Sequence, residues 1–409
     1  MNTKYDKVLG MIREVDGNAS EFYVGAEWSP MDPNTAWRRV GNPDILVQYL
    51  QNCKVVALTD AGVENATLAT YSAPTLTGAV DGSNGQVMVK FPKLYFKEAF
   101  GNNGGVGAGA MRGVYISLLP LDGFTAHPKF TWGNGRQNIY IGAYEASNSG
   151  GNVLQSISGA AVLANIDLAT FRSRAVARGT GWHGYDFYSH HLLQLLFYVY
   201  YAHANSQFVL PGYTEASAWA DAYRRATGRS NTLATINGSI DADLAGVDSD
   251  LVAGGITAGE KVANRFLWIE NIFGHIWKFT DGVAYDGRVG QPNTAWVTPN
   301  PTLFSSVEAN ILANYTNLGV ALPAATNEAY MQELQTLFLP KTHGGASTTY
   351  ITDYFYSYLD DASRNYLRVG LVGGALDYGG LAGVAARYAF YGLGLAYSHF
   401  GSRLCFESN

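Results

Sequence analysis

Short runs of alternating apolar and polar residues dominate the first hundred positions of the chain. Examples are Glu21 to Val24, Lys54 to Leu58 and Gln86 to Leu94, and Gly, Asn, Asp or Pro separates one run from the next. A period of two is the pattern of a strand with one buried face, and the residues between the runs favour turns. The pattern therefore predicts a β-rich N-terminal region over residues 1–100.

The middle of the chain carries helical patterns. Leu168 to Arg178 and Asp186 to Ala204 have helical length and few helix-breaking residues, and Asp186 is placed to cap the second segment. Because this second segment is hydrophobic on most faces, we expect it to be the buried central helix. A third helix is predicted over Thr214 to Thr227, with Gly228 just past its end.

Strand-like and loop segments dominate from Arg265 to the end, so helices and strands are segregated along the chain instead of alternating. Segregation of this kind predicts an α+β fold. The glycine-rich segment from Gly101 to Gly113 lacks the Gly-Lys-Ser/Thr ending of a phosphate loop, and Arg112 stands where a dinucleotide fingerprint has its last glycine. We expect a hairpin tip or linker there, which divides the N-terminal region from a larger domain over residues 101–409.

Composition narrows the class of partner. The 409 residues are 47% hydrophobic but only 15% charged, with a net charge of −6. Ordinary globular proteins carry about 25% charged residues. No basic run is present, and binding to phosphate needs clustered Lys and Arg, so nucleic acid is excluded as a partner. A chain poor in charge and rich in aromatics suits neutral glycans or other proteins.

Neither export nor membrane insertion is predicted. The first twenty residues have no apolar run after their lysines, which argues against a secretory signal and for folding in the cytosol. Leu192 to Ala202, the longest apolar stretch, is about half of what a bilayer crossing needs. Cys53 and Cys405 lie far apart in the sequence and offer neither a disulfide framework nor a metal knuckle, so two buried free thiols are expected.

The sequence contains no HExxH, GxSxG, paired CxxC or Walker motif, and no catalytic residue, cofactor or metal site is predicted. A carboxylate pair drawn from distant positions stays open as an alternative. His190 and His191 point in different directions on a helix, so they do not face one ion. Asn237 to Asp250 is rich in acidic and amide residues, but its spacing is not that of a calcium loop and favours a polar surface loop. The histidines considered as metal ligands are at positions 183, 190, 191, 203 and 275.

The segment from Val369 to Phe406 has an unusual composition. Up to Arg403 its only charged residues are Asp377, Arg387 and Arg403, while glycines alternate with tyrosines and phenylalanines. Tyrosine and glycine together form the residue set of antibody loops, because tyrosine gives a large amphipathic contact and glycine frees the backbone. Two interpretations remain: a ligand-binding surface, or glycine-rich β-structure with a buried aromatic core.

Several separated blocks also carry a resemblance to a known group. They are DGSNGQVMVKFPKLYFK, IYIGAYEAS, GTGWHGYDFYSHHLLQLLFYVYYAHANSQ, IENIFGHIWKFTDG, LFLPKTHGGASTTYITDY and the ending LRVGLVGG…AGV…FGSRLCF. Together they resemble the C-type-lectin-fold proteins of bacteriophage tails and prophages, which are allied to the formylglycine-generating-enzyme superfamily. The similarity runs from about residue 20 to the C-terminus.

The resemblance implies a small twisted antiparallel sheet flanked by two helices, with C-terminal hairpins that present a ligand surface. Within IENIFGHIWKFTDG, we expect Gly274 to permit a tight turn before a strand. We also expect the indole N–H of Trp277 to bond a buried carbonyl rather than a ligand. The expected core residues are Trp268, Phe273, Trp277 and Phe279.

The enzymes of that superfamily oxidise a cysteine of their substrate with copper held by a pair of cysteines in the C-terminal part of the fold. This chain has only Cys405 there, because Cys53 lies in the N-terminal region. The thiolate pair for copper is missing, so we expect the oxidase chemistry to be lost. A shared fold does not guarantee a shared function, and the binding role has to be argued from the surface.

Some relatives are the targets of diversity-generating retroelements, which rewrite codons near the end of the gene and leave a fixed frame. Laid on that pattern from Gly373, the chain matches at Gly373, Gly374, Gly379, Ala382, Gly383, Val384, Gly401, Ser402, Arg403, Leu404, Cys405 and Phe406. The mismatches fall mainly where the family varies, and ordinary drift explains them as well as diversification does. By the resemblance, the ligand-binding residues are Leu376, Asp377, Tyr378, Leu381, Arg387, Tyr388, Phe390, Tyr391, Leu395, Tyr397 and His399.

The hypothesis from sequence is a phage-tail receptor-binding protein. Its N-terminal region would attach it to other tail proteins of the virion, and its C-terminal domain would adhere to a protein or glycan receptor on the bacterial surface. A homotrimer is expected from related tail proteins, since several weak contacts together raise avidity. Two alternatives remain: a structural tail-tip component without host contact, and a superfamily enzyme that acts as an oxidase or cleaves glycans.

Overall fold

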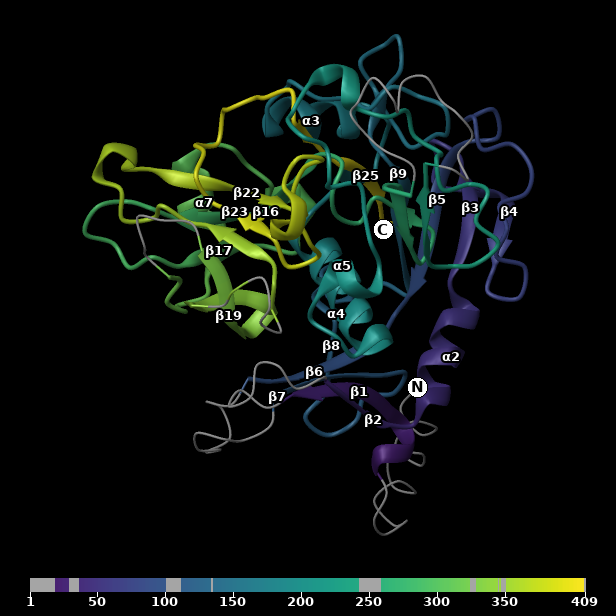
Figure 1. Cartoon of the computed structure of the whole chain (residues 1–409), viewed down its shortest axis with the longest axis horizontal. Helices are drawn as coiled ribbons and strands as arrows, with labels where there is room; N and C mark the ends of the chain where they lie inside the picture. Colours follow the sequence, from purple (N-terminus) through teal and green to yellow (C-terminus); the bar gives the residue numbers. More distant parts are fainter. Residues whose placement is uncertain are drawn as a thin grey trace.

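The computed structural model describes residues 19–28, 37–100, 112–133, 135–242, 259–323, 329–344, 346 and 351–407. Within them, helices and mainly antiparallel sheets are mixed, and the sheets are arranged around helix α4 (Phe187–Tyr201) (Figure 1). The bounds of the other helices are α2 (Pro43–Asn52), α3 (Leu168–Val176), α5 (Ser206–Val209) and α7 (Glu308–Asn314).

One sheet is built from the N-terminal part of the chain and lies at one end of the molecule, the lower end in Figure 1. Neighbouring strands in it pair antiparallel. Its order is β2 (Arg38–Gly41), β1 (Tyr23–Trp28), β7 (Arg112–Ser117), β6 (Tyr95–Ala99) and β8 (Thr125–Ala126).

A second sheet joins distant parts of the sequence. The C-terminal strand β25 is inserted between β12 and β9, and β9 pairs with β5 from the N-terminal region. Strands from both sides of residue 100 therefore share this sheet, as they share the first. Its order is β12 (Trp182–Gly184), β25 (Arg403–Phe406), β9 (Asn138–Glu145), β5 (Gln86–Pro92), β3 (Lys54–Leu58) and β4 (Glu64–Thr70).

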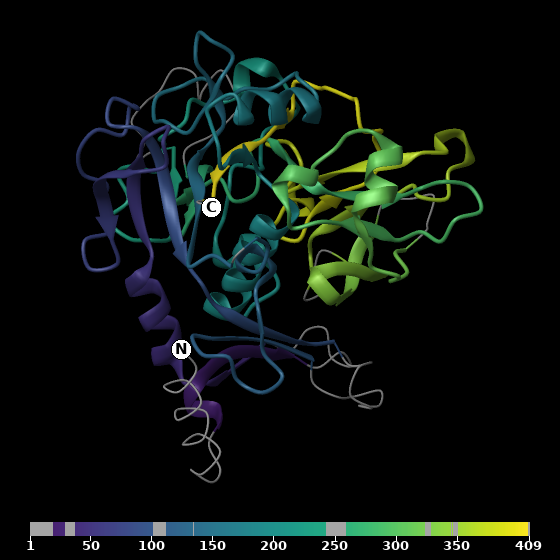
Figure 2. The ribbon, with the colours of Figure 1, turned by 180° about the vertical axis from the view of Figure 1, so that it is seen from behind.

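The third large sheet carries most of the C-terminal half and lies on the other side of α4, as the view from behind also shows (Figure 2). Strand β24 (Phe400–Gly401) pairs parallel with β16 at its start. The order is β18 (Thr316–Asn317), β17 (Ala295–Val297), β16 (Trp277–Asp286), β22 (Leu367–Val372), β23 (Arg387–Tyr388), β21 (Tyr354–Tyr356), β19 (Ala329–Gln335) and β20 (Leu339–His343). Smaller sheets are β10 (Ser147–Asn148) with β11 (Leu154–Gln155), and β13 (Gly238–Asp241), β14 (Lys261–Phe266) and β15 (Ile269–Glu270).

The predicted helices α3 and α4 are confirmed. Asp186 caps α4, and its carboxylate accepts the backbone N–H groups of Tyr188 and Ser189, each at 3.0 Å. The helix is buried over nearly its whole length and ends where Ala202 takes a left-handed backbone conformation. Asp167 caps α3 in the same way through the N–H of Thr170. Of the expected strands, β3 and β5 occupy the predicted runs.

The prediction of a third helix over Thr214 to Thr227 is wrong. Residues 214–227 form turns and one short 3-10 turn at Asp221–Tyr223. Their backbone groups are used elsewhere: the N–H of Ala216 donates to the carbonyl of Leu376 at 2.9 Å, and the carbonyl of Thr214 accepts the N–H of Gly379 at 2.8 Å. Pairing with the C-terminal segment thus replaces the hydrogen bonds of a helix.

The aromatic core expected around β16 is confirmed. Trp268, Phe273, Trp277 and Phe279 are all buried, and Gly274 has φ +74° with no room for a side chain next to the carbonyl of Tyr213. Gly274 is therefore a position that only glycine fills without strain. The segments 101–111 and 243–250, which include most of the expected linker and of the acidic loop, lie outside the described residues.

Candidate functional site

The C-terminal segment leaves β22 through two glycines that turn the chain. Gly373 and Gly374 have φ +94° and +81°, and a side chain on Gly374 would overlap Ala382. The close approach of these two backbone stretches folds the segment back onto the third sheet. The turn is therefore fixed by glycine and by the small side chain of Ala382.

Polar side chains from α5 hold the backbone of the returning segment. The side chain of Gln207 donates to the carbonyls of Gly379 and Ala382, in the second case at 3.0 Å. Ser206 Oγ accepts the N–H of Val384 at 2.9 Å. These bonds engage the main chain only, so they position the segment whatever side chains it carries.

Two buried side chains, His190 and Asp353, also bind the backbone of the segment, and we call these four side chains, with Ser206 and Gln207, the clamp. His190 Nε2 lies 2.9 Å from the carbonyl oxygen of Val384, and Asp353 Oδ2 accepts the N–H of Ala385 at 2.7 Å. Burial raises the pKa of Asp353 to about 7, although the N–H of Ala385 and the hydroxyl of Ser206 counteract this rise. Among the described residues, no ion pair of Asp353 is present, and its carboxyl group lies where the segment turns back onto the sheet.

On this frame lies a continuous row of aromatic rings, which we call the ring ladder. Consecutive ring centroids are 4.7 to 5.4 Å apart, in the range of direct aromatic contact. In spatial order its members are Trp219, His399, Tyr397, Tyr391, Tyr388, Tyr356, Tyr354 and Tyr330.

The middle of the ladder is stacked ring on ring. Tyr388 lies between Tyr356 and Tyr391, with interplanar angles of 22° and 8°. Both of its faces are therefore covered, and its hydroxyl is hydrogen-bonded to that of Tyr391. Burial raises the pKa of Tyr388 well above its ordinary value, and the neighbouring phenol of Tyr391 raises it further, so both stay neutral at physiological pH.

Trp277 forms the floor beneath the ladder. Its ring is fully buried and meets Tyr356, Tyr378 and Tyr388 edge to face at 6.0, 5.2 and 5.3 Å. The expected carbonyl partner is absent: Nε1 has no hydrogen-bond partner among the described residues.

Of the eleven predicted ligand-binding residues, nine are exposed or half-buried, and two are buried. Leu376 is fully buried against Tyr213 and Ile240, and Arg387 is fully buried. The Arg387 guanidinium donates to Gln194 Oε1 at 3.1 Å and lies over the ring of Phe187. The prediction that Leu376 and Arg387 lie on the ligand surface is therefore wrong, and both are core residues. Leu395 and Tyr397 are exposed, and the half-buried positions are Asp377, Tyr378, Leu381, Tyr388, Phe390, Tyr391 and His399.

Two arginines that touch this surface, Arg364 and Arg224, are paired with aspartates. Arg364 lies 3.9 Å above the ring of Phe390 and forms an ion pair with Asp361. Arg224 donates to the carbonyl of Ser398 and lies 3.7 Å from Asp221. In contrast, Oδ1 of Asp377 has no partner in the described part of the chain, and burial raises the pKa of this carboxyl.

An open groove adjoins the ladder on the far side of the loop that follows Tyr391. Its volume is about 470 Å³. Glu308 lies in its wall and accepts the N–H of Leu367 at 3.2 Å. The lining residues are Ser306, Glu308, Tyr366, Leu367, Gly392, Leu393, Gly394 and Leu395.

Sequence reasoning missed the part of the ladder that comes from outside the C-terminal segment. Tyr354 and Tyr356 stand in β21, Tyr330 in β19, and Trp219 in the segment that was expected to be helical. A signal was present, since tyrosines at 354, 356 and 358 recur with the period of a strand and share one face. Tyr358 itself contacts Phe390 at 5.0 Å.

The histidines considered as metal ligands have other partners. His190 and His191 face different groups, as expected: His191 lies 2.9 Å from Glu98 and 2.8 Å from His127. His275 lies against the buried carboxylate of Glu145, whose pKa burial would raise but His275 and Lys278 lower.

One group of described residues, His183, Asp186 and Cys405, has the spacing of metal ligands. Lys129, itself buried, forms ion pairs with Asp186, at 2.9 Å, and with Glu407. An ammonium group therefore stands where a metal ion would have to neutralise these carboxylates. Burial raises the pKa of the Cys405 thiol well above its ordinary value, which disfavours the thiolate that metal binding needs. Cys53 and Cys405 are both buried free thiols, as expected.

Among the residues that the structure describes, no helix has the length and hydrophobicity needed to cross a bilayer. No protein-family model matches the sequence, and the search of curated proteins found no match.

Proposed function

We propose that this protein is a receptor-binding protein of a bacteriophage tail, and that the ring ladder with the rest of the 369–406 segment is its ligand-binding surface. The observation that carries the proposal is the ladder itself. It is a row of eight aromatic rings, of which only Tyr356 is buried and four come from the glycine-rich segment, and that segment is held from below by contacts to its main-chain atoms. Aromatic side chains on a rigid frame are typical of recognition surfaces.

The division between frame and surface supports the idea of a segment that tolerates diversification by a retroelement. Apart from the half-buried Gly379, every frame position matched in the sequence is buried. Most of the positions assigned to the ligand are not. Because the clamp engages backbone atoms, substitution of exposed side chains leaves the path of the chain in place. Such an arrangement suits a surface whose specificity changes while its fold is kept.

We also propose that the domain has the C-type lectin fold of the formylglycine-generating-enzyme superfamily, without the enzyme's chemistry. Helices α3 and α4 both pack on β16, and β16 pairs antiparallel with β22, which leads into the segment. Two helices packed against an antiparallel sheet support this proposal. The single cysteine in the C-terminal part of the chain supports the loss of copper chemistry.

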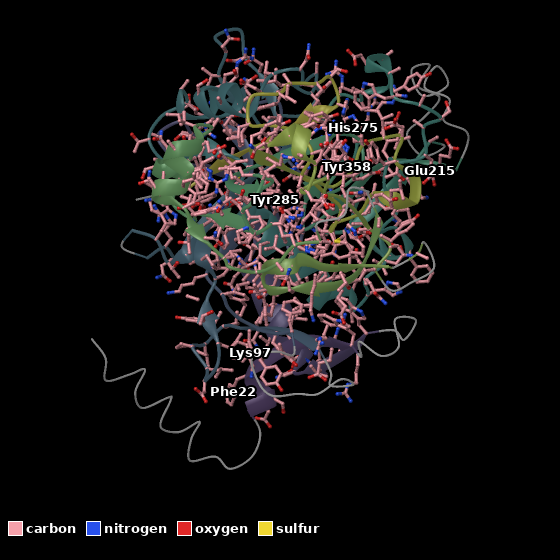
Figure 3. All side chains as sticks on the ribbon, turned by 90° about the vertical axis from the view of Figure 1, so that its left-hand side faces the viewer. Phe22, Lys97, Glu215, His275, Tyr285 and Tyr358 are labelled. Atoms are coloured by element: carbon pink, nitrogen blue, oxygen red, sulfur yellow. The ribbon has the colours of Figure 1, made fainter. Side chains whose placement is uncertain are left out.

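The position of the N-terminal sheet is compatible with attachment to the virion. Figure 3 places Phe22, which directly precedes strand β1 of that sheet, and Lys97 of strand β6 at one end of the molecule, whereas Tyr358 and Glu215, next to the ligand surface, lie toward the other. A protein attached through the first end would direct the ladder away from the particle. We further propose a homotrimer, in which three ladders act together and raise the avidity of weak contacts.

Binding of the purified protein to a panel of bacterial strains tests the proposal. Leu395→Ser with Tyr397→Ala removes the two most exposed large side chains of the segment, which are 39% and 38% exposed. A matched control, Val63→Ser with Val176→Ser, alters side chains that are 61% and 55% exposed elsewhere. We expect the wild type and the control to bind one strain, and the segment variant to lose binding while its thermal unfolding is unchanged.

Two results would contradict the proposal. Equal binding by the segment variant would place the site elsewhere. Absence of binding to every strain, together with an inaccessible Tyr397 on intact particles, would favour a structural tail component whose aromatic face is covered by another tail protein.

A further inference from the structure

A ligand on the ring ladder would meet the hydroxyl groups of its tyrosines more than the apolar faces of their rings. Both faces of Tyr388 are covered by its neighbours, and Tyr391 is stacked on it in turn. The described residues include buried polar atoms without a partner, such as Nε1 of Trp277, but none of these is a hydroxyl of a ladder tyrosine. The hydroxyl of Tyr391 is hydrogen-bonded to those of Tyr388 and Tyr397. Because a phenol both donates and accepts, such a hydroxyl row keeps capacity for further hydrogen bonds.

Apolar area on this surface is small. Of the large hydrophobic side chains in the segment, only Leu395 and Tyr397 are exposed by more than a third in the described structure. Stable interfaces between proteins are built around aromatic or aliphatic anchors that enter pockets of the partner. Here the rings are already packed against one another and against Trp277, so few are free to enter a partner's pocket.

The charges on this surface exclude one class of polar ligand. Both arginines at its edge, Arg224 and Arg364, are paired with aspartates. The carboxylates of Asp377 and Glu215 lie on adjacent paired segments, because residues 214–216 hydrogen-bond with residues 376–379. A polyanion would meet no unpaired cation among these residues and would be repelled by the acids.

We propose that the ligand is a neutral, hydroxyl-rich glycan chain that lies along the ring ladder and is bound through the phenol hydroxyls of Tyr388, Tyr391 and Tyr397; this inference rests on the proposed function. A phenol both donates and accepts hydrogen bonds, as a sugar hydroxyl does, so the two kinds of group pair without any net charge. The rings that carry these hydroxyls follow one another in a row, which suits an extended chain.

Substitution of the three tyrosines by phenylalanine tests the inference, because it removes the hydroxyl groups alone. Tyr388→Phe, Tyr391→Phe and Tyr397→Phe together remove the hydroxyls and keep every ring contact, so the fold is preserved. We expect the affinity for a strain that binds wild type to fall about tenfold or more, because several hydrogen bonds are lost at once. The matched control is Tyr95→Phe, in the distant N-terminal sheet. Undiminished affinity of the triple variant would overturn the inference.

Treatment of the same cells distinguishes a glycan from a protein receptor. Mild periodate, which cleaves vicinal diols, should abolish binding, and digestion of surface proteins with protease should not. The purified neutral polysaccharide of that strain should compete, and added salt should have little effect. Binding that protease removes and periodate spares would overturn the glycan inference while leaving the adhesin proposal intact. If wild type binds no untreated strain, both fall together.

Discussion

The carboxylate of Asp353 accepts the backbone N–H of Ala385 at 2.7 Å, and this bond ties the third sheet to the segment that carries most of the ligand surface. Neither residue is exposed. The same carboxylate occupies the space next to Gly383, two residues earlier. A buried acid and a glycine therefore set the path of the chain beneath the ring ladder.

A methyl group at position 383 should be destabilising for this reason. In Gly383→Ala the new Cβ would overlap the Asp353 carboxylate, and we expect a loss of about 1–3 kcal/mol in the free energy of unfolding, the usual cost of overpacking. Urea unfolding measures it. Gly394→Ala is the control, because a Cβ there meets no atom within 4 Å. Equal effects of the two substitutions would contradict the prediction.

The raised pKa of Asp353 predicts a pH dependence. Its folded pKa is about 7 and its ordinary value is 3.8, so between these values the folded state binds a proton that the unfolded state has lost. The contribution of Asp353 to stability is therefore complete below pH 4 and is lost as the pH rises through 7. The size is a few kcal/mol at most, since one pKa unit corresponds to ~1.4 kcal/mol.

Urea unfolding of wild type and Asp353→Asn across this pH range isolates that contribution. The difference in unfolding free energy between the two proteins should shift against wild type as the pH rises from about 4 to 7, and should then level off. Glu407, another buried acid, does not interfere: burial alone would raise its pKa, but Lys129 and His183 lower it to about 2. A difference that does not vary with pH would show that Asp353 is ionised throughout.

Lys129 should be essential to the buried network near the C-terminus. In Lys129→Met the carboxylates of Asp186 and Glu407 lose their shared cation inside the protein, and we expect a destabilisation of about 3–5 kcal/mol. Lys54→Met is the comparison. Its ion pair with Glu64 is partly exposed, Lys90 also contacts Glu64, and the expected cost is below about 1 kcal/mol. Thermal or chemical unfolding of the two variants measures both losses of stability, and equal losses would contradict the prediction.

The same residue also bears on metal binding. If Lys129 fills the place of an ion beside His183, Asp186 and Cys405, added Zn²⁺ or Cu²⁺ should leave the melting temperature of wild type unchanged. Elemental analysis of the purified protein should find no stoichiometric metal. A rise in melting temperature at micromolar zinc, reversed by chelation, would contradict this prediction.

Leu376 and Leu395 separate stability from binding. Leu376 is fully buried, so Leu376→Ala should cost about 2–5 kcal/mol in the free energy of unfolding. Leu395 is 39% exposed, and Leu395→Ala should change stability by less than about 0.5 kcal/mol while weakening binding to the receptor. Paired unfolding and cell-binding measurements check both. A stability loss at Leu395 as large as that at Leu376 would show that the loop is packed more tightly than its exposure indicates.

Features with a local physical cause were determined by the sequence alone. Asp186 predicts the start of helix α4, because its carboxylate caps the first turn. Gly274 predicts a turn, because only glycine takes this backbone conformation without strain. The alternating runs that became β3 and β5, and the burial of Trp268 and Phe279, likewise follow from patterning within a short stretch. The composition of the segment after Val369 predicted a ligand surface there, and this function stays a prediction.

Only the tertiary structure decided which side chains of that segment reach solvent and which rings meet them. Arg387 became a core residue because Gln194 and Phe187 lie beneath it. The helix predicted over residues 214–227 did not form, because residues 214–216 pair with residues 376–379 and later backbone groups bond other segments. The ring ladder draws on Trp219, Tyr330 and Tyr356 because strands distant in the sequence pair side by side in one sheet. Such contacts depend on strand pairing across long loops, which no local pattern of residues encodes.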